Sequence, residues 1–409
     1  MNRVLTVGMM AGLLAVALPT THAAGWQQED GQARQPGRYE QAAVEAAERA
    51  AQRYAQAVRV SDEARAIHET VYVFDGHNDL PWTMRSRANS SFDNVDISKP
   101  TEFHTDIDRL RAGGVKAQFW SVYVPVSTMA DGNAHITTLE QIDLVNRMCQ
   151  RYPDVFEIAL TADDVDRIAA SGKIASLIGV EGGHSIENSL ARLRELYDRG
   201  ARYMTLTHSR NLDWADSCTD EPKVGGLSEF GEEVVREMNR LGMLVDISHV
   251  SPECMRKTLA VTRAPVIFSH SSAKAICDHP RNVPDDVLRL TAENGGVVMV
   301  NFFTNFVLPT GITDIQRDAR GDLRVVADHI DHVVEVAGID HVGIGSDYDG
   351  IPRVPHGLDD VSTYPRLTQE LLDRGYNRGQ IQKIMGGNMM RVLREAEAVS
   401  RQMQPAAAR

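Results

Sequence analysis

The feature that most constrains the fold is a regular alternation of short apolar runs and amphipathic segments along most of the chain. Each run has the length of a buried strand, and each is followed by a segment with helical spacing. The runs are Val71–Phe74, Val115–Val122, Ile174–Val180, Tyr203–Thr207, Met243–Ile247, Pro265–Phe268, Val297–Val300 and His341–Gly345. Strict alternation implies a parallel sheet covered by helices, and eight units predict an α/β fold of the (β/α)8 TIM-barrel type.

Further helices are predicted on both sides of this pattern. Residues 39–69 are rich in Ala, Glu, Arg and Gln, which favour helices, and residues 361–401 have the spacing of two or three more. We therefore expect a barrel at 64–401 and a flexible or helical extension at 24–63. An open, doubly wound sheet has the same alternation and is the structural alternative.

The first 23 residues have the pattern of a secretory signal. A basic head at Asn2-Arg3 precedes an apolar run from Val4 to Leu18, and Thr21-His22-Ala23 offers a small-residue cleavage site. The run is shorter than the roughly 20 residues that a membrane span needs, and the polar tail resembles no lipid-anchor signal. We expect an exported protein, periplasmic or secreted, without a stable membrane anchor.

Charge and cysteine content exclude several classes of protein. The chain has 56 acidic and 43 basic residues, a formal net charge of −13. Such a chain lacks the overall basic character of nucleic-acid-binding proteins, so we expect no nucleic-acid partner. Four cysteines in 409 residues are too few for a disulfide scaffold.

Metal-ligand side chains gather where the predicted strands end, which is the catalytic end of a TIM barrel. They are His77, Asp79, Glu181, His249 and His270. His77 and Asp79 are two residues apart, so on one extended segment both side chains are expected to project to the same side. Imidazoles and carboxylates are the ligands that zinc and related divalent ions select. Five are too many for one closed tetrahedral site and suit two ions that share a carboxylate. Glu181 is the expected bridge because it lies between the two sets in chain order.

Two such ions about 3.5–4 Å apart can hold a hydroxide, polarise a carbonyl and stabilise the resulting oxyanion, which is the equipment for hydrolysing an amide. Asp347, on the predicted eighth strand at Gly343-Ile344-Gly345-Ser346-Asp347, is the expected proton shuttle, with a loop-capping or metal-ligand role as the alternative. His208 is expected to stabilise the oxyanion. Arg281 has the forked donor that could bind a substrate carboxylate, although a surface arginine that caps the next helix is the alternative.

The remaining predicted strand-end and loop histidines are expected to play ordinary structural parts. This group comprises His104, His135, His279, His329, His332, His341 and His356. His184 is ambiguous, since it could support Glu181 from behind the ligand shell.

Longer motifs around these residues resemble the renal (membrane) dipeptidase family of zinc metallopeptidases. They are Asp75-Gly76-His77-Asn78-Asp79-Leu80-Pro81-Trp82, Gly179-Val180-Glu181-Gly182-Gly183-His184-Ser185, Leu206-Thr207-His208-Ser209, Asp246-Ile247-Ser248-His249-Val250-Ser251, Ala264-Pro265-Val266-Ile267-Phe268-Ser269-His270-Ser271-Ser272, Arg281-Asn282-Val283-Pro284-Asp285-Asp286 and Gly345-Ser346-Asp347-Tyr348-Asp349-Gly350. The resemblance extends from about Ala64 to Ala398 and implies a TIM barrel with two zinc ions per chain.

The resemblance also implies a role for each residue. His77 and Asp79 would bind one zinc, His249 and His270 the other, and Glu181 would bridge them. The substrate contacts would be His208 and Arg281, with Asp347 moving the proton. The implied substrate is a dipeptide with a free carboxylate end, often a D-residue there, and some members also open β-lactam rings.

One segment departs from the family pattern. Some members carry tyrosines just after the seventh strand, whereas this chain has Asn301-Phe302-Phe303-Thr304-Asn305-Phe306. No phenol hydroxyl is available from there, so the preferred dipeptide could differ.

Two alternatives to a dipeptidase remain open. Another amidohydrolase, acting on a lactam or lactone, usually carries His-x-His on its first strand and often a modified lysine bridge, where this chain has His77-x-Asp79 and Glu181. An exported binding protein that has lost catalysis would bind metal without turnover. A homodimer is one candidate for the oligomeric state.

Overall fold

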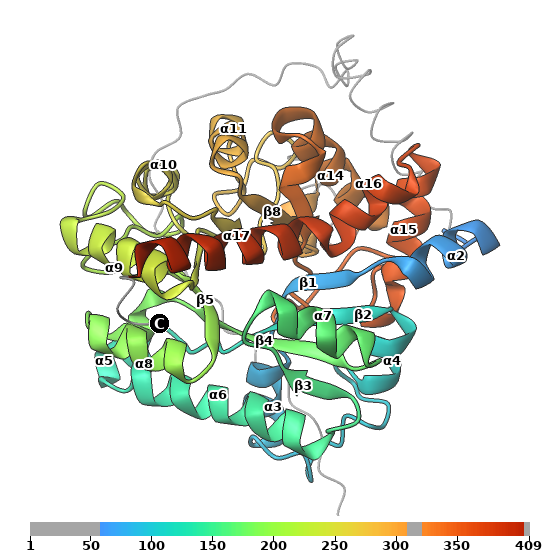
Figure 1. Cartoon of the computed structure of the whole chain (residues 1–409), viewed down its shortest axis with the longest axis horizontal. Helices are drawn as coiled ribbons and strands as arrows, with labels where there is room; N and C mark the ends of the chain where they lie inside the picture. The colour runs from blue at the N-terminus through green and yellow to red at the C-terminus, as the bar shows by residue number, and fades with distance from the viewer. Residues whose placement is uncertain (1–57, 309–320, 405–409) are drawn as a thin grey trace, which may run out of the picture. The chain divides into compact units, whose positions relative to one another are not determined.

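Eight parallel strands close into a barrel in the computed structural model, which describes residues 58–308 and 321–404 (Figure 1). The strands are, in order around the ring, β1 (Val73–Asn78), β2 (Val115–Ser121), β4 (Ile174–Glu181), β5 (Ala201–Thr205), β6 (Leu244–Asp246), β7 (Ile267–Phe268), β8 (Val297–Val300) and β9 (Val342–Ile344). Pairing of β1 with β9 and of β2 with β4 closes the ring. The closed ring confirms the predicted TIM barrel and excludes the alternative, an open, doubly wound sheet.

One short strand was missing from the prediction. β3 (Phe156–Ile158) pairs with the amino-terminal end of β4, outside the ring. Three residues are too few to show a periodicity, so the sequence pattern carries no signal for this strand.

Helices follow the strands around the outside of the barrel (Figure 1). They are α3 (Leu80–Ala88), α4 (Ile107–Ala112), α5 (Thr128–Asp131), α6 (Ala134–Arg151), α7 (Ala162–Ala170), the 3-10 turn η1 (Gly183–Ile186), α8 (Leu190–Asp198), α9 (Glu229–Leu241), α10 (Pro252–Val261), α11 (Asp285–Asn294), α12 (Thr304–Val307), α14 (Leu323–Ala337) and the 3-10 turn η2 (Ile339–His341). Local sequence sets their ends. The hydroxyl of Ser228, for example, accepts from the Gly231 amide to start α9, and Gly242 ends that helix at φ 83°.

The extra helices at both ends are also present, with one correction. α2 (Asp62–Thr70) begins after Ser61, whose extended backbone and hydroxyl cap it, so the helical prediction for residues 39–69 is wrong at residues 58–61. The C-terminal elements are the 3-10 turn η3 (Val361–Thr363), α15 (Tyr364–Asp373), α16 (Arg378–Gln382), the π-helical turn η4 (Lys383–Gly387) and α17 (Asn388–Met403).

The C-terminal helix α17 packs against the amino-terminal end of the barrel. Its Asn388 side chain donates to the Val342 carbonyl at 2.8 Å, just where β9 begins. Its Ser400 hydroxyl donates to the Arg240 carbonyl at 2.7 Å, before β6. The α17 side chains Met389 and Leu393 belong to the same apolar cluster as the barrel interior. Because α17 covers this end, the opposite, carboxyl end is the one available for a site.

Some predictions fall outside the described residues. The signal at 1–23 and nearly all of the extension at 24–63 lie there, so these boundaries, and the barrel boundary at 64–401, stay predictions. Within the described ranges, none of the helices combines the length and apolar character needed to cross a membrane.

Candidate metal centre

The five predicted ligands converge at the carboxyl end of the barrel, with Glu181 between two pairs. His77 Nε2 lies 3.2 Å from Asp79 Oδ2 and 3.5 Å from Glu181 Oε2. On the other side, His249 Nε2 and His270 Nε2 lie 3.1 and 3.4 Å from Glu181 Oε1. Each oxygen of Glu181 therefore faces a different pair.

The donor atoms suit bound cations. All five residues are at most 9% exposed, and His77 Nε2 and Asp79 Oδ1 are buried without a hydrogen-bond partner among the described residues. His249 Nε2 and His270 Nε2 face each other at 2.9 Å. Leaving buried polar atoms unpaired costs free energy, and this set of nitrogen and oxygen donors matches the preference of zinc-like ions. The residues therefore fit a metal centre of two overlapping three-residue groups that share Glu181.

The charges of its neighbours favour the ionised form of Glu181. Although burial raises the pKa of Glu181, the surrounding imidazoles of His77, His249 and His270 lower it well below its usual range. The Ser121 hydroxyl, at the end of β2, donates to Glu181 Oε2 at 3.2 Å and holds the carboxylate in place.

Turns after the strands aim several of these side chains. Asp79 lies beyond β1, at φ −95° and ψ 23°, so the prediction that His77 and Asp79 share one extended segment was wrong at Asp79. His249 and Asp347 adopt positive φ angles of 66° and 65°. Such backbone is unfavourable for non-glycine residues and occurs often at functional sites.

The first histidine is supported from inside the barrel. His77 Nδ1 lies 2.8 Å from the hydroxyl of Tyr203, a buried residue of β5. The Tyr203 ring occupies the space beside Gly179, where a Cβ would lie 2.0 Å from the ring. Glycine at 179 is therefore required for the tyrosine that holds His77. Sequence reasoning missed both residues, since neither is a ligand type.

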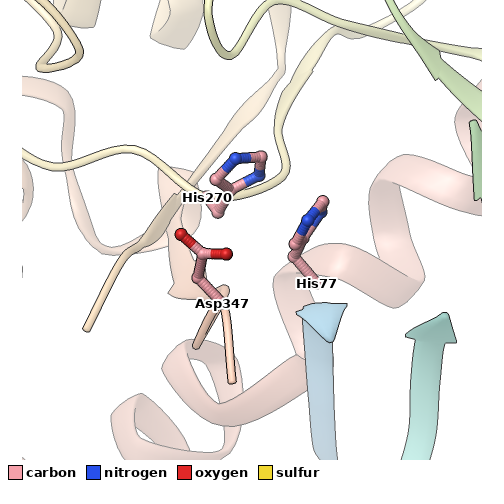
Figure 2. A group of neighbouring side chains, drawn as sticks. All are labelled: His77, His270 and Asp347. Carbon is pink, nitrogen blue, oxygen red and sulfur yellow. The ribbon is translucent and has the colours of Figure 1, made fainter. Parts of the chain in front are cut away.

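Asp347 points into the cluster from the turn after β9. Figure 2 shows its carboxylate directed toward the space between His77 and His270, and the three can together hold an ion. Asn301 donates to Asp347 Oδ2 at 2.8 Å. Burial, together with the negative charges of Asp79 and Glu181, raises the pKa of Asp347 well above its usual range.

The backbone near Asp347 must pass close to the acids. A Cβ at Gly350 would lie 2.2 Å from Asp79 Oδ2 and 2.8 Å from Asp347 Oδ1. Glycine is therefore the residue that lets this turn approach the two carboxylates.

The predicted substrate residues line a cavity of about 370 Å³ above the cluster. His208 Nε2 lies 3.8 Å from Glu181 Oε1. Arg281 is only 3% exposed, so the surface-arginine alternative is wrong. Its guanidinium donates to the His270 carbonyl at 3.1 Å and to the Ser271 hydroxyl at 3.2 Å, beside the Phe306 ring.

The cavity walls include aromatic residues that sequence reasoning missed. They are Trp82, Tyr123, Phe303 and Phe306. The Tyr123 ring, just past β2, stacks edge-on with Trp82 and lies 4.9 Å from the His208 ring. Tyr123 thus contributes a phenol side chain to the cavity wall from the end of β2, whereas the segment after β8 has no tyrosine.

Other histidines have ordinary hydrogen bonds. His135 contacts the Ser185 carbonyl and Glu195, and His329 contacts the Val307 carbonyl. His184 Nε2 lies 3.0 Å from the Val124 carbonyl, so its ring is held by the backbone. All four cysteines are free thiols.

A TIM barrel with a buried histidine–carboxylate cluster at the carboxyl ends of its strands defines the class of metal-dependent barrel hydrolases. Within that class, the chain belongs to the membrane dipeptidase family (peptidase family M19), whose sequence profile matches residues 61–407. It is a metallo-dipeptidase, and membership of this family implies a metal cofactor and a small peptide substrate.

Named relatives and solved structures agree. The chain is 45% identical to Dipeptidase 3 of Mus musculus over 346 residues, which are 83% of this chain and 68% of the relative. It is 44% identical to Dipeptidase 3 of Homo sapiens over 341 residues, 82% and 67% of the two chains.

Two crystal structures show the same barrel. The probable dipeptidase PvdM of Pseudomonas aeruginosa is 26% identical with a TM-score of 0.73, covering 82% of this chain and 98% of that one. A metallo peptidase of Rhodobacter sphaeroides, liganded with a phosphinate mimic of the dipeptide L-Ala-D-Ala, is 27% identical with a TM-score of 0.71, covering 80% and 99%.

Proposed function

We propose that this metallo-dipeptidase is an exported, binuclear zinc enzyme that hydrolyses L-L and L-D dipeptides. The observation that carries the two-metal proposal is the placement of Glu181, one oxygen facing His77 and Asp79 and the other facing His249 and His270. The set of three imidazoles and two carboxylates supports zinc as the ion.

Each residue at the cavity has a proposed task. Ions held by the cluster would supply Lewis acidity and a water of lowered pKa. Arg281 binds the carboxylate end of the dipeptide and so places the peptide bond over the cluster. His208 donates a hydrogen bond to the carbonyl oxygen as it gains negative charge. Asp347 takes a proton from the attacking water and delivers it to the departing amine nitrogen.

The size of the cavity supports a short substrate. About 370 Å³ lies near the small end of the range for small-molecule sites, which suits a dipeptide better than a longer chain. Hydrolysis of L-D dipeptides is supported by the Rhodobacter sphaeroides relative and its mimic of L-Ala-D-Ala. The amino-terminal sequence pattern supports export, and a homodimer remains a prediction.

A panel of L-L and L-D dipeptides tests the function. We expect the zinc-loaded protein to cleave members of both sets, chelation to abolish cleavage, and zinc add-back to restore it with two ions per chain. Lactam and lactone substrates in the same panel test the amidohydrolase alternative. Metal binding without turnover of any dipeptide would favour the binding-protein alternative and overturn the proposal.

Replacing Arg281 by alanine is expected to weaken binding of dipeptides without removing metal. Loss of charged hydrogen bonds worth about 1.5–3 kcal/mol implies a rise in KM of about 10–100-fold. Dipeptide amides, which lack the carboxylate, are the matched control. Their KM should be nearly the same for the Arg281→Ala variant and for the natural protein. A fall in metal content would show instead that Arg281 mainly holds the His270 loop through the His270 carbonyl.

A further inference from the structure

A buried series of hydrogen bonds runs from Asp246 to His270 behind the metal ligands. Asp246 is the last residue of β6, while Ser269 and His270 directly follow β7. Ser269 Oγ lies 2.6 Å from Asp246 Oδ2 and 2.8 Å from His270 Nδ1. All three residues are at most 1% exposed. The hydrogen-bond choices of each group are therefore limited to its protein neighbours.

The direction of these bonds follows from the donors around Asp246. The backbone N–H groups of Ser248 and Ser269 donate to Oδ1 at 3.0 and 2.9 Å. The hydroxyls of Thr205 and Ser269 reach Oδ2 at 2.5 and 2.6 Å. A carboxylate only accepts, and a serine hydroxyl has one hydrogen. Ser269 therefore gives its hydrogen to Asp246, and its oxygen accepts from Nδ1 of His270.

We propose that Asp246 is a positioning residue that acts through Ser269 to hold His270 in the tautomer with its hydrogen on Nδ1. The lone pair then lies on Nε2, the atom that faces Glu181 Oε1 at 3.4 Å and His249 Nε2 at 2.9 Å. A metal-bound imidazole needs its lone pair there, and the partner of the other nitrogen sets the tautomer. The inference rests on the proposed role of His270 as a metal ligand.

His77 differs from His270 in how its tautomer is set. His77 Nδ1 meets the Tyr203 hydroxyl, which can either donate or accept. That contact alone leaves the tautomer of His77 undetermined. The Asp246 carboxylate removes this freedom for His270, because it takes the hydrogen of Ser269.

An Asp246→Asn variant reverses the direction of the series. Its amide oxygen would stay with the two backbone N–H groups, so its NH2 would face Thr205 and Ser269. Ser269 would then accept from the amide and donate to His270 Nδ1, which moves the imidazole hydrogen to Nε2. We expect affinity for the second zinc ion to fall about 10–100-fold. We also expect 15N NMR of the metal-free, histidine-labelled protein to report hydrogen on Nε2 of His270 instead of Nδ1.

Two further variants complete the test. Thr205→Val removes the other hydroxyl at Asp246 Oδ2 without changing the direction of the series, so it should keep the natural tautomer and near-natural zinc affinity. Ser269→Ala removes the acceptor and should weaken zinc binding even if Asp246→Asn does not fold. The proposal is overturned if His270 of the natural protein carries hydrogen on Nε2, or if both Asp246→Asn and Ser269→Ala keep natural affinity. Failure of the natural protein to bind two ions would refute the proposed function, while NMR would still decide the tautomer.

Discussion

Replacing Glu181 by glutamine is expected to remove both metal ions and with them the activity. An amide has only one oxygen to offer and carries no charge, so it cannot face both pairs, His77 with Asp79 and His249 with His270, as a ligand. Removing one partner of a buried charge pair costs about 3–5 kcal/mol, which corresponds to a loss of metal affinity of roughly 10²–10⁴-fold. Metal content after dialysis, together with zinc titration of the metal-free protein, measures the effect.

Ser121→Ala is the matched control for this variant. It removes the hydrogen bond to Glu181 Oε2 but leaves both carboxylate oxygens and the charge in place. We expect a much smaller fall in affinity and retention of both ions. A Glu181→Gln protein that still holds two ions would contradict the bridging role, and one that holds a single ion would assign Glu181 to one pair only.

Replacing Asp347 by asparagine is expected to lower kcat by about 10²–10⁴-fold, the contribution typical of a positioned proton-transfer group. The substitution keeps the shape of the side chain but removes the site that takes and gives the proton. Metal content and KM should stay close to their natural values, because Asp347 is proposed to act on the proton and not to hold the ion. Steady-state kinetics with metal analysis of the same sample gives both quantities.

The same experiment separates the two roles open to Asp347. Because its carboxylate can share an ion with His77 and His270, a metal-ligand role would appear as loss of metal with the activity. Asp349→Asn makes the same change in the same turn, where the Asp349 carboxylate accepts from the His104 amide at 2.7 Å, and should lower kcat far less. A kcat for Asp347→Asn within tenfold of the natural value would exclude Asp347 as the proton shuttle.

Much of the barrel could be predicted because buried strands leave a local signal. Strands such as β4, with all eight residues buried, read as continuous apolar runs. β3 lacks that signal because it is short and lies outside the ring. Asp79 and Asp347 were placed on extended chain, whereas turns beyond the strands hold them, and backbone angles of a turn depend on packing that a residue pattern does not describe.

The residues that line the cavity were harder to predict than the candidate metal ligands beneath it. Candidate metal ligands can be recognised in the sequence by residue type and by position after an apolar run. Tyr123 and Trp82 have no such signal, because only the contact between the loops that carry them places them at the cavity. Arg281 is similar, since its burial against the His270 carbonyl depends on a contact between separate loops. Asp246 and Ser269 were visible within motifs, yet only their distances reveal a directed series of hydrogen bonds.

The amino-acid sequence by itself determined which metal-ligand-type side chains the chain offers and that they follow strands, because residue type and position after an apolar run are both local properties. Only the tertiary structure decided how these side chains meet. Closure of the ring, through the β1–β9 and β2–β4 pairs, sets the distances across the carboxyl end of the barrel. At these distances one oxygen of Glu181 faces His77, beside Asp79, and the other faces His249 and His270. Such distances arise from packing between residues far apart in the chain, which a pattern along the chain does not encode directly.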